Sequence, residues 1–230
     1  MPFSRSVWRF ANDRRGAALV EATILIPFLF VFALGAVDFL FAFYQWSTAG
    51  KAVEVGARLA AVSNPVAAGL NALSTYAVSS GLASPGDPMP PFAITCNGST
   101  STCTCVGTVC TGISYDSDAM NTIVFGRDGK GQCGDAASFY FAGMCDVGGS
   151  VRIGVRNVQI VYKQSGLGYA GRPGGPVPTV TVSLLPNLKF HYFFLNSLMK
   201  FADIPLPSMT TTFTGEALSS AAQCPPAASC

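Results

Sequence analysis

The hydrophobic pattern of this chain is dominated by an apolar run over residues 22–44. The residues that interrupt it are Thr23, Pro27, Gly35 and Asp38. At about 1.5 Å of rise per residue, a helix of that length extends ~34 Å, enough to cross a hydrocarbon core of about 30 Å. We expect Pro27 to kink the helix without ending it, because lipid leaves the backbone no better way to satisfy its polar groups. The run therefore predicts one transmembrane helix.

The helical pattern continues beyond the membrane. A stripe of small residues, suited to close approach of another helix or a sheet, consists of Ala49, Val53, Gly56 and Ala60. We therefore expect one helix over residues 17–63, which ends before Asn64-Pro65. The same pair can begin a second helix, with Asn64 as N-cap and Pro65 at the first helical position, and Gly81 is the expected stop.

After Gly81 the composition changes to Pro, Gly, Ser, Thr and Cys, and no helical period is visible between residues 96 and 145. We expect loops and short strands there, held by crosslinks. Three strands follow over residues 151–162, 180–184 and 209–213, the first with a bulge near Asn157. They are β-branched and short, and they favour an antiparallel sheet with one face on the core.

The predicted fold class is α+β. A long N-terminal transmembrane helix continues into a small antiparallel-sheet ectodomain with a disulfide-rich insert. The expected domains are a cytoplasmic leader (1–16), the transmembrane and extended helix (17–63), and an α+β domain (64–230) that contains the cysteine-rich insert (96–145).

An aromatic segment lies between the last two predicted strands. Its apolar residues fall at helical spacing: Phe190, Phe193, Phe194, Leu198 and Phe201. Core packing and an exposed ridge for partners both fit this spacing. His191 within it has no serine, cysteine or carboxylate neighbour in a recognisable nucleophile arrangement, so the sequence does not indicate catalysis there.

Glu21 is an ionisable residue at the start of the apolar region, where a charge is costly and usually has a function. If a peptidase cuts after Gly16, Ala17 becomes the new amino terminus, and Glu21 lies about one helical turn, ~6 Å, further along the axis. In an assembly of parallel helices this carboxylate can neutralise the α-amine of a neighbour. The alternative is a tolerated charge that reaches the cytoplasmic headgroups.

Asp38 lies at the other end of the apolar run. At ~32 Å from Ala17 along the helix axis, we expect it among the outer headgroups, where water can reach it. Tyr44 and Trp46 are expected interfacial anchors.

The charge distribution orients the predicted helix. The first 16 residues carry Arg5, Arg9, Arg14 and Arg15 against a single acid, Asp13. The positive-inside rule therefore predicts a cytoplasmic amino terminus. The apolar run is longer than that of an ordinary secretory signal. With a net charge of +2 and 11% charged residues, the chain also lacks the basic surface of a nucleic-acid binder.

All eight cysteines follow the apolar run, and their even number on one side of the membrane favours disulfides in an oxidising compartment. They are Cys96, Cys103, Cys105, Cys110, Cys133, Cys145, Cys224 and Cys230. The pairing stays open, with Cys133–Cys145 and Cys224–Cys230 the pairs whose loops we expect to be easiest to close. A zinc site around Cys103, Cys105 and Cys110 is the competing reading, but no two CxxC pairs occur. We expect no cofactor.

Two further motifs have structural interpretations. Residues 166–171 match GxGxxG, but the Pro- and Gly-rich sequence that follows cannot open the helix that a dinucleotide site needs, so we expect a hairpin loop. Four aspartates do not reproduce the spacing of an EF-hand loop, and we interpret them as solvated loop acids: Asp116, Asp118, Asp128 and Asp135.

The amino-terminal third resembles the TadE-like family of tight-adherence pilus proteins. The features that carry the resemblance are Gly16 before a small residue, Glu21 at the fifth position after it, Pro27, Asp38 and the stretch Gly56–Ala61. The resemblance is specific over residues 14–63. It is looser over residues 151–218, where residues 180–182 and 209–213 resemble the strands that close the family's small sheet.

The resemblance implies a pseudopilin or minor pilin of the Flp (type IVc) system. Gly16 would then be the cleavage-site residue, Ala17 the mature terminus and Glu21 the assembly carboxylate. Ala22 stands where major Flp pilins usually carry an aromatic residue, which favours a minor component over the major subunit. The implied partners are a prepilin peptidase, an inner-membrane assembly platform and other pilins or pseudopilins.

The sequence thus predicts a single-pass inner-membrane protein with a periplasmic carboxyl-terminal domain, which can be incorporated into an extracellular pilus. It would work by assembly and not as an enzyme. The alternative is an uncleaved, membrane-anchored periplasmic binding module or enzyme, with its site in the cysteine-rich region.

Overall fold

The computed structural model describes residues 14–127, 132–134, 142–149, 151–194, 196, 204–215 and 218. The chain divides into two compact units. One contains the described residues up to Phe43 and the segment that begins at His191. The other contains residues 44–190 and the described residues from 204 onward. Each unit is described by itself below.

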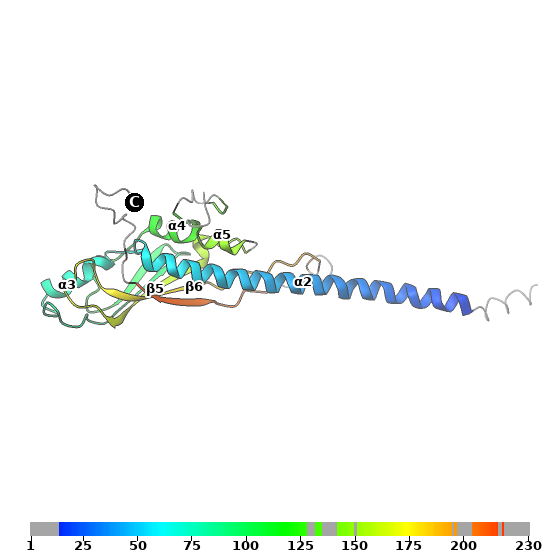
Figure 1. Cartoon of the computed structure of the whole chain (residues 1–230), viewed down its shortest axis with the longest axis horizontal. Helices are drawn as coiled ribbons and strands as arrows, with labels where there is room; N and C mark the ends of the chain where they lie inside the picture. Colours follow the sequence, from blue (N-terminus) through cyan, green and yellow to red (C-terminus); the bar gives the residue numbers. More distant parts are fainter. Residues whose placement is uncertain are drawn as a thin grey trace, which may run out of the picture. The chain divides into compact units, whose positions relative to one another are not determined.

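Helix α2 (Arg14–Val62) is the long helix predicted from the apolar run (Figure 1). It continues through Pro27, as expected, and it ends one residue before Ser63 and the Asn64-Pro65 pair. Its part in the first unit exposes apolar side chains, among them Leu25, Phe28 and Phe39. Such a surface is costly in water and requires lipid or protein around it.

The second unit is built on a five-stranded antiparallel sheet in the order β3-β2-β5-β6-β7. Its strands are β2 (Phe92–Asn97), β3 (Thr102–Gly107), β5 (Val158–Leu167), β6 (Val177–Leu184) and β7 (Thr210–Thr214). Alternate residues of β6 are buried, as the period-2 pattern predicted. The antiparallel sheet and the α+β fold class are therefore confirmed.

The predicted stripe of small residues is the part of α2 that packs in the second unit. Ala49, Val53 and Ala60 are fully buried in one core with sheet residues such as Ile160 and Val182. Figure 1 shows the cyan end of α2 lying along the strands of this sheet. Small side chains let the helix approach the sheet closely.

Gly56 gives the same stripe its closest contact. A Cβ atom at this position would lie 2.5 Å from Cγ of Met144, so the methionine side chain occupies the space that a larger residue would need. Met144 lies in α5 (Met144–Gly148), which covers α2 at this point. The glycine is therefore a packing residue.

The second helix begins later than predicted. Asn64-Pro65 leads instead into β1 (Ala67–Ala68), η1 (Leu70–Ala72) and only then α3 (Leu73–Ser79). The reason is that Val66 uses both backbone polar groups in tertiary contacts: its N–H donates to the Tyr162 hydroxyl, and its carbonyl accepts from the Asp116 N–H. A helix from Pro65 would give up these bonds.

The predicted stop at Gly81 is confirmed. Gly81 has φ +73°, its N–H donates to the Val78 carbonyl, and the Leu82 N–H donates to the Ala77 carbonyl. These two hydrogen bonds around a residue in the left-handed conformation form the Schellman motif, which ends helices at glycine.

The cysteine-rich insert contains helices that the sequence analysis did not predict. They are α4 (Ser117–Phe125) and α5, and a two-residue strand, β4 (Ser114–Tyr115), pairs with β1. Asp116, interpreted as a solvated loop acid, is the N-cap of α4, where its Oδ1 accepts the N–H groups of Asp118 and Ala119.

The first predicted strand begins later than expected and extends further, as β5 (Val158–Leu167). Residues 151–154 are not in a strand, and η3 (Val155–Asn157) separates them from β5. The change of phase near Asn157 therefore comes from a turn in which Asn157 accepts the Gly154 N–H through its side chain. The register irregularity of the sheet lies instead between Gln164 and Leu167. There the GxGxxG segment enters the β5–β6 loop, as predicted.

Tyr162 is the largest fully buried side chain of this core, and its hydroxyl is the acceptor for the Val66 N–H, 3.0 Å away. We expect Tyr162→Phe to lower the free energy of unfolding by about 1–3 kcal/mol, because it leaves a buried donor unpaired. Urea denaturation of the detergent-solubilised chain measures this. Tyr76→Phe, at a partly exposed position of α3, is the control and should have little effect.

Burial raises the pKa of Tyr162 above its ordinary value. The folded state therefore holds the phenolic proton at a pH where the unfolded chain releases it. Stability should fall as the pH rises through about 10, the ordinary tyrosine value, and the Tyr162→Phe variant should lack this contribution. An equal alkaline loss in both proteins would contradict this assignment.

Candidate membrane-assembly segment

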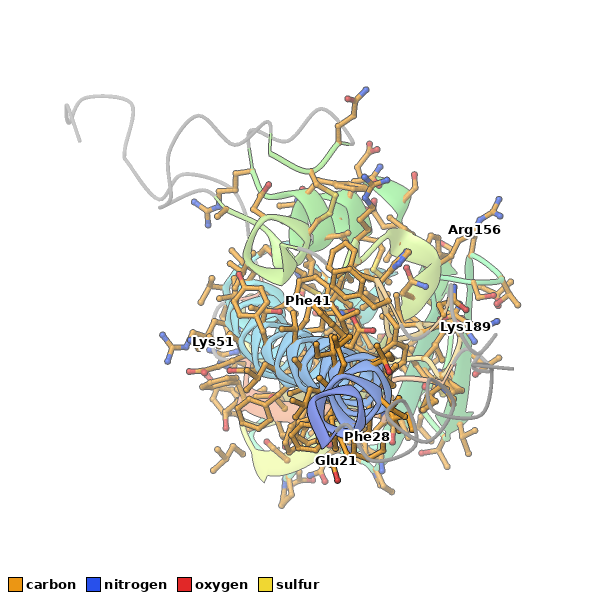
Figure 2. All side chains as sticks on the ribbon, turned by 90° about the vertical axis from the view of Figure 1, so that its right-hand side faces the viewer. Glu21, Phe28, Phe41, Lys51, Arg156 and Lys189 are labelled. Atoms are coloured by element: carbon orange, nitrogen blue, oxygen red, sulfur yellow. A yellow bond between two sulfur atoms is a disulfide. The ribbon has the colours of Figure 1, made fainter. Side chains whose placement is uncertain are left out.

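The residues of the predicted processing site lie near the start of α2, and the structure leaves Gly16 accessible. Gly16 is exposed, and a Cβ atom built on it meets nothing within 4 Å. Glu21 is exposed and extends away from the helix (Figure 2). Ala17 belongs to the same helix, which places it four residues before Glu21, about one turn.

The surroundings of Glu21 are apolar. Val20 and Ile24 beside it are exposed, and Phe28, about two turns further on, is 71% exposed. Helix α2 is the one helix in the described part of the chain that is long and apolar enough to cross a membrane. A carboxylate at the edge of such a surface requires a cationic partner or a position at the headgroups.

Asp38 occupies a site that the sequence analysis did not anticipate. It was predicted to lie among headgroups with access to water, yet its exposed fraction is 0%. Its two carboxylate oxygens accept the backbone N–H groups of Phe193 and Phe194, both at 2.9 Å. The sequence signal was the carboxylate itself, but nothing local could indicate partners 155 residues away.

The aromatic segment is packed at one end and exposed at the other, so core packing holds for Phe190, and a ridge for partners stays a prediction. Phe190 is partly buried against the core of the second unit, whereas Phe193 and Phe194 are 61% and 43% exposed. Residues 190–194 do not form the helix that their spacing suggested. The Phe193 ring contacts Phe41 on α2, with 4.7 Å between the ring centroids. Leu198 and Phe201 lie outside the described residues.

The cysteines of the insert form three disulfides. They join Cys96 to Cys103, Cys105 to Cys110 and Cys133 to Cys145. The last is one of the two short loops named from the sequence. The other, Cys224–Cys230, lies outside the described residues, as do the leader residues 1–13 and the acids Asp128 and Asp135.

The alternative metal site has no support among the residues that the structure describes. Within the described ranges, no group of three or more His, Cys, Asp or Glu side chains could hold a metal ion. The cysteines proposed as an alternative zinc site are instead in disulfides, and His191 is exposed in the aromatic segment.

The comparisons with known proteins bear on this same helix. The family model of the TadE-like proteins matches residues 16–58, which begin at the predicted cleavage residue and end where α2 packs in the second unit. The searches of curated proteins and of solved structures gave no match. The family is associated with pili of the tight-adherence system. The resemblance stated for the amino-terminal third is thus confirmed over residues 16–58, which are similar to the TadE-like family.

Proposed function

We propose that this chain is a minor pilin or pseudopilin that takes part in assembly of Flp (tight-adherence) pili. Its leader is cleaved after Gly16, and Glu21 guides assembly. The observation that carries the proposal is an exposed carboxylate on a long, uncovered apolar helix, in the segment that matches the TadE-like family. A helix of this kind needs either lipid or parallel neighbours around it.

The proposed assembly step pairs opposite charges. Cleavage after Gly16 gives Ala17 a protonated α-amine, and the Glu21 carboxylate of an adjacent subunit accepts it. In a medium of low dielectric constant, such a pair is strong and fixes the axial register of the two helices. An uncut leader would place Arg14 and Arg15 at this position and prevent the fit.

The proposed location is the inner membrane, with a single crossing and a periplasmic carboxyl-terminal domain. The arginines before Gly16 favour a cytoplasmic start, and the three disulfides favour an oxidising compartment for the other end. The proposed partners are a prepilin peptidase, the inner-membrane assembly platform, and other pilins or pseudopilins. Incorporation into the extracellular pilus follows from the same contacts.

Intact-mass measurement of the membrane-extracted chain tests the processing step. We expect a protein that begins at Ala17 when the chain is expressed with its prepilin peptidase. The full leader should persist when the peptidase is absent, and Gly16→Leu should block cleavage because a bulky side chain replaces the exposed glycine. If Met1 and the leader are retained with the peptidase present, the chain is an uncleaved membrane-anchored protein, and the pilin proposal fails.

A further inference from the structure

We infer that the turn His191–Phe194 is a second membrane contact, which Asp38 holds against α2 and which inserts Phe193 and Phe194 into the interface of the outer leaflet. This inference rests on the membrane anchoring in the proposed function. It assigns a lipid-binding role to a segment far in sequence from the transmembrane helix. The four residues belong to the same compact unit as the apolar part of α2.

The bonds to Asp38 explain how the turn can leave water. In an apolar medium, each backbone N–H group without an acceptor has a free-energy cost on the order of several kcal/mol. Asp38 accepts two of them, from Phe193 and Phe194, at 2.9 Å each. The carboxylate in turn is fully buried and receives the charge-assisted bonds that compensate its lost hydration. In this inference, the Asp38 carboxylate positions the turn against α2.

The depth of Asp38 places the turn at the membrane surface. Counted from Ala17, Asp38 lies ~32 Å along the helix axis, close to the full thickness of a hydrocarbon core. Large exposed side chains follow Asp38 along α2 over about the next 12 Å: Phe39, Leu40, Phe43, Tyr44 and Trp46. Aromatic belts of this composition are typical of membrane–water interfaces.

Lipid is the occupant that the surface chemistry favours. Phe193 and Phe194 are exposed beside a helix whose apolar residues, Phe28 and Phe32 among them, are uncovered. The Phe193 ring contacts Phe41 of this same helix, so a bilayer around the helix can also reach the two phenylalanines. His191 and Tyr192, which precede the two phenylalanines, have the amphipathic rings that tolerate a boundary between water and hydrocarbon.

Fluorescence quenching by brominated phospholipids tests the inference in the full chain, reconstituted in phosphatidylcholine–phosphatidylglycerol vesicles. The two native tryptophans are first replaced (Trp8→Phe, Trp46→Phe), and one reporter is added. Phe194→Trp keeps the Phe41–Phe193 contact and reports the turn. Phe28→Trp reports the centre of the membrane helix, and Tyr76→Trp reports the second unit.

We expect the Phe194→Trp reporter to be quenched most by lipids brominated near the headgroup. The Phe28→Trp reporter should be quenched by lipids brominated deep in the acyl chain. The Tyr76→Trp reporter should be quenched by neither kind of lipid. Quenching at Phe28→Trp without quenching at Phe194→Trp overturns the inference and leaves the anchor intact. Absence of quenching at both sites overturns the anchor as well. If the Phe194→Trp reporter is not quenched by lipid in vesicles and is shielded from solvent only in assembled pili, the turn contacts a neighbouring subunit and the inference is overturned.

Asp38→Leu tests the positioning role, since it removes both acceptors and adds an apolar side chain. We expect quenching of the Phe194→Trp reporter to fall toward the level of the Tyr76→Trp reporter, with the Phe28→Trp reporter unchanged. Thr23→Leu is the matched control, because Thr23 is a polar residue of the same helix that bonds only locally, to the Val20 carbonyl. Unchanged quenching in Asp38→Leu would show that the turn does not depend on Asp38.

Discussion

Replacing Glu21 by glutamine is expected to leave leader cleavage intact and to reduce incorporation of this chain into pili by about a hundredfold or more. The variant keeps the size and shape of the side chain and removes its charge. The α-amine of the neighbouring subunit then enters the apolar environment without a counter-charge. Leaving one partner of a buried ion pair uncompensated costs about 3–5 kcal/mol. Each 1.4 kcal/mol corresponds to roughly a tenfold change in an equilibrium constant.

The measurement is the amount of this chain in sheared pili, relative to the amount in the membrane. Glu54→Gln is the matched control, because Glu54 lies in the same helix but forms an exposed ion pair with Arg58, at 2.6 Å. Exposed pairs of this kind contribute about 0–1 kcal/mol, so the control should assemble normally. Equal incorporation of the Glu21→Gln variant and the native chain would exclude the proposed role of Glu21.

Strong periodicity made the long helix and the C-terminal strands predictable. Over residues 22–44 the apolar run leaves helix as the one way to satisfy the backbone, and the end of α2 at Val62 follows from Asn64-Pro65. The alternation in β6 and β7 reflects a sheet with one face on the core. In these elements, local preference and tertiary contacts agree.

The sequence analysis was wrong at two places, one where tertiary contacts determine the structure and one where a local signal was misinterpreted. At Val66, two bonds to distant residues, Tyr162 and Asp116, override a good helix start. At α4 the helix was missed because Asp116 was interpreted as a loop acid, although an N-cap acid followed by buried Ala119, Met120 and Ile123 has helical spacing. The local sequence therefore contained the signal for α4, but it contained no signal for the distant bonds at Val66.

The two acids of the apolar helix illustrate the same distinction for the candidate site. The interest of Glu21 could be read from the sequence because its proposed partner is defined by the chain itself, through the proposed cleavage point one turn before it. The environment of Asp38 could not be predicted, since its bonds reach Phe193 and Phe194. In the described structure Glu21 is exposed, whereas Asp38 is buried and bonded within its own unit.

The second large effect is expected on reduction of the disulfides. The loops closed by the three described links have sequence separations of 7, 5 and 12 residues. The chain-entropy relation assigns about 2–3 kcal/mol to each, hence about 7 kcal/mol together. A domain of this size is typically stable by about 5–15 kcal/mol, so the loss is comparable to the whole.

We therefore expect dithiothreitol to unfold much of the second unit, or to lower its Tm strongly, when unfolding of the detergent-solubilised chain is followed by circular dichroism. Among paired alanine variants, Cys133→Ala with Cys145→Ala should cost most, because this link closes the longest of the three loops and Cys145 is buried. The matched control is a chain with Cys224→Ala and Cys230→Ala, which keeps the three described links and should lose as much stability on reduction as the native chain. An unchanged Tm of the native chain on full reduction would show that packing alone maintains this fold.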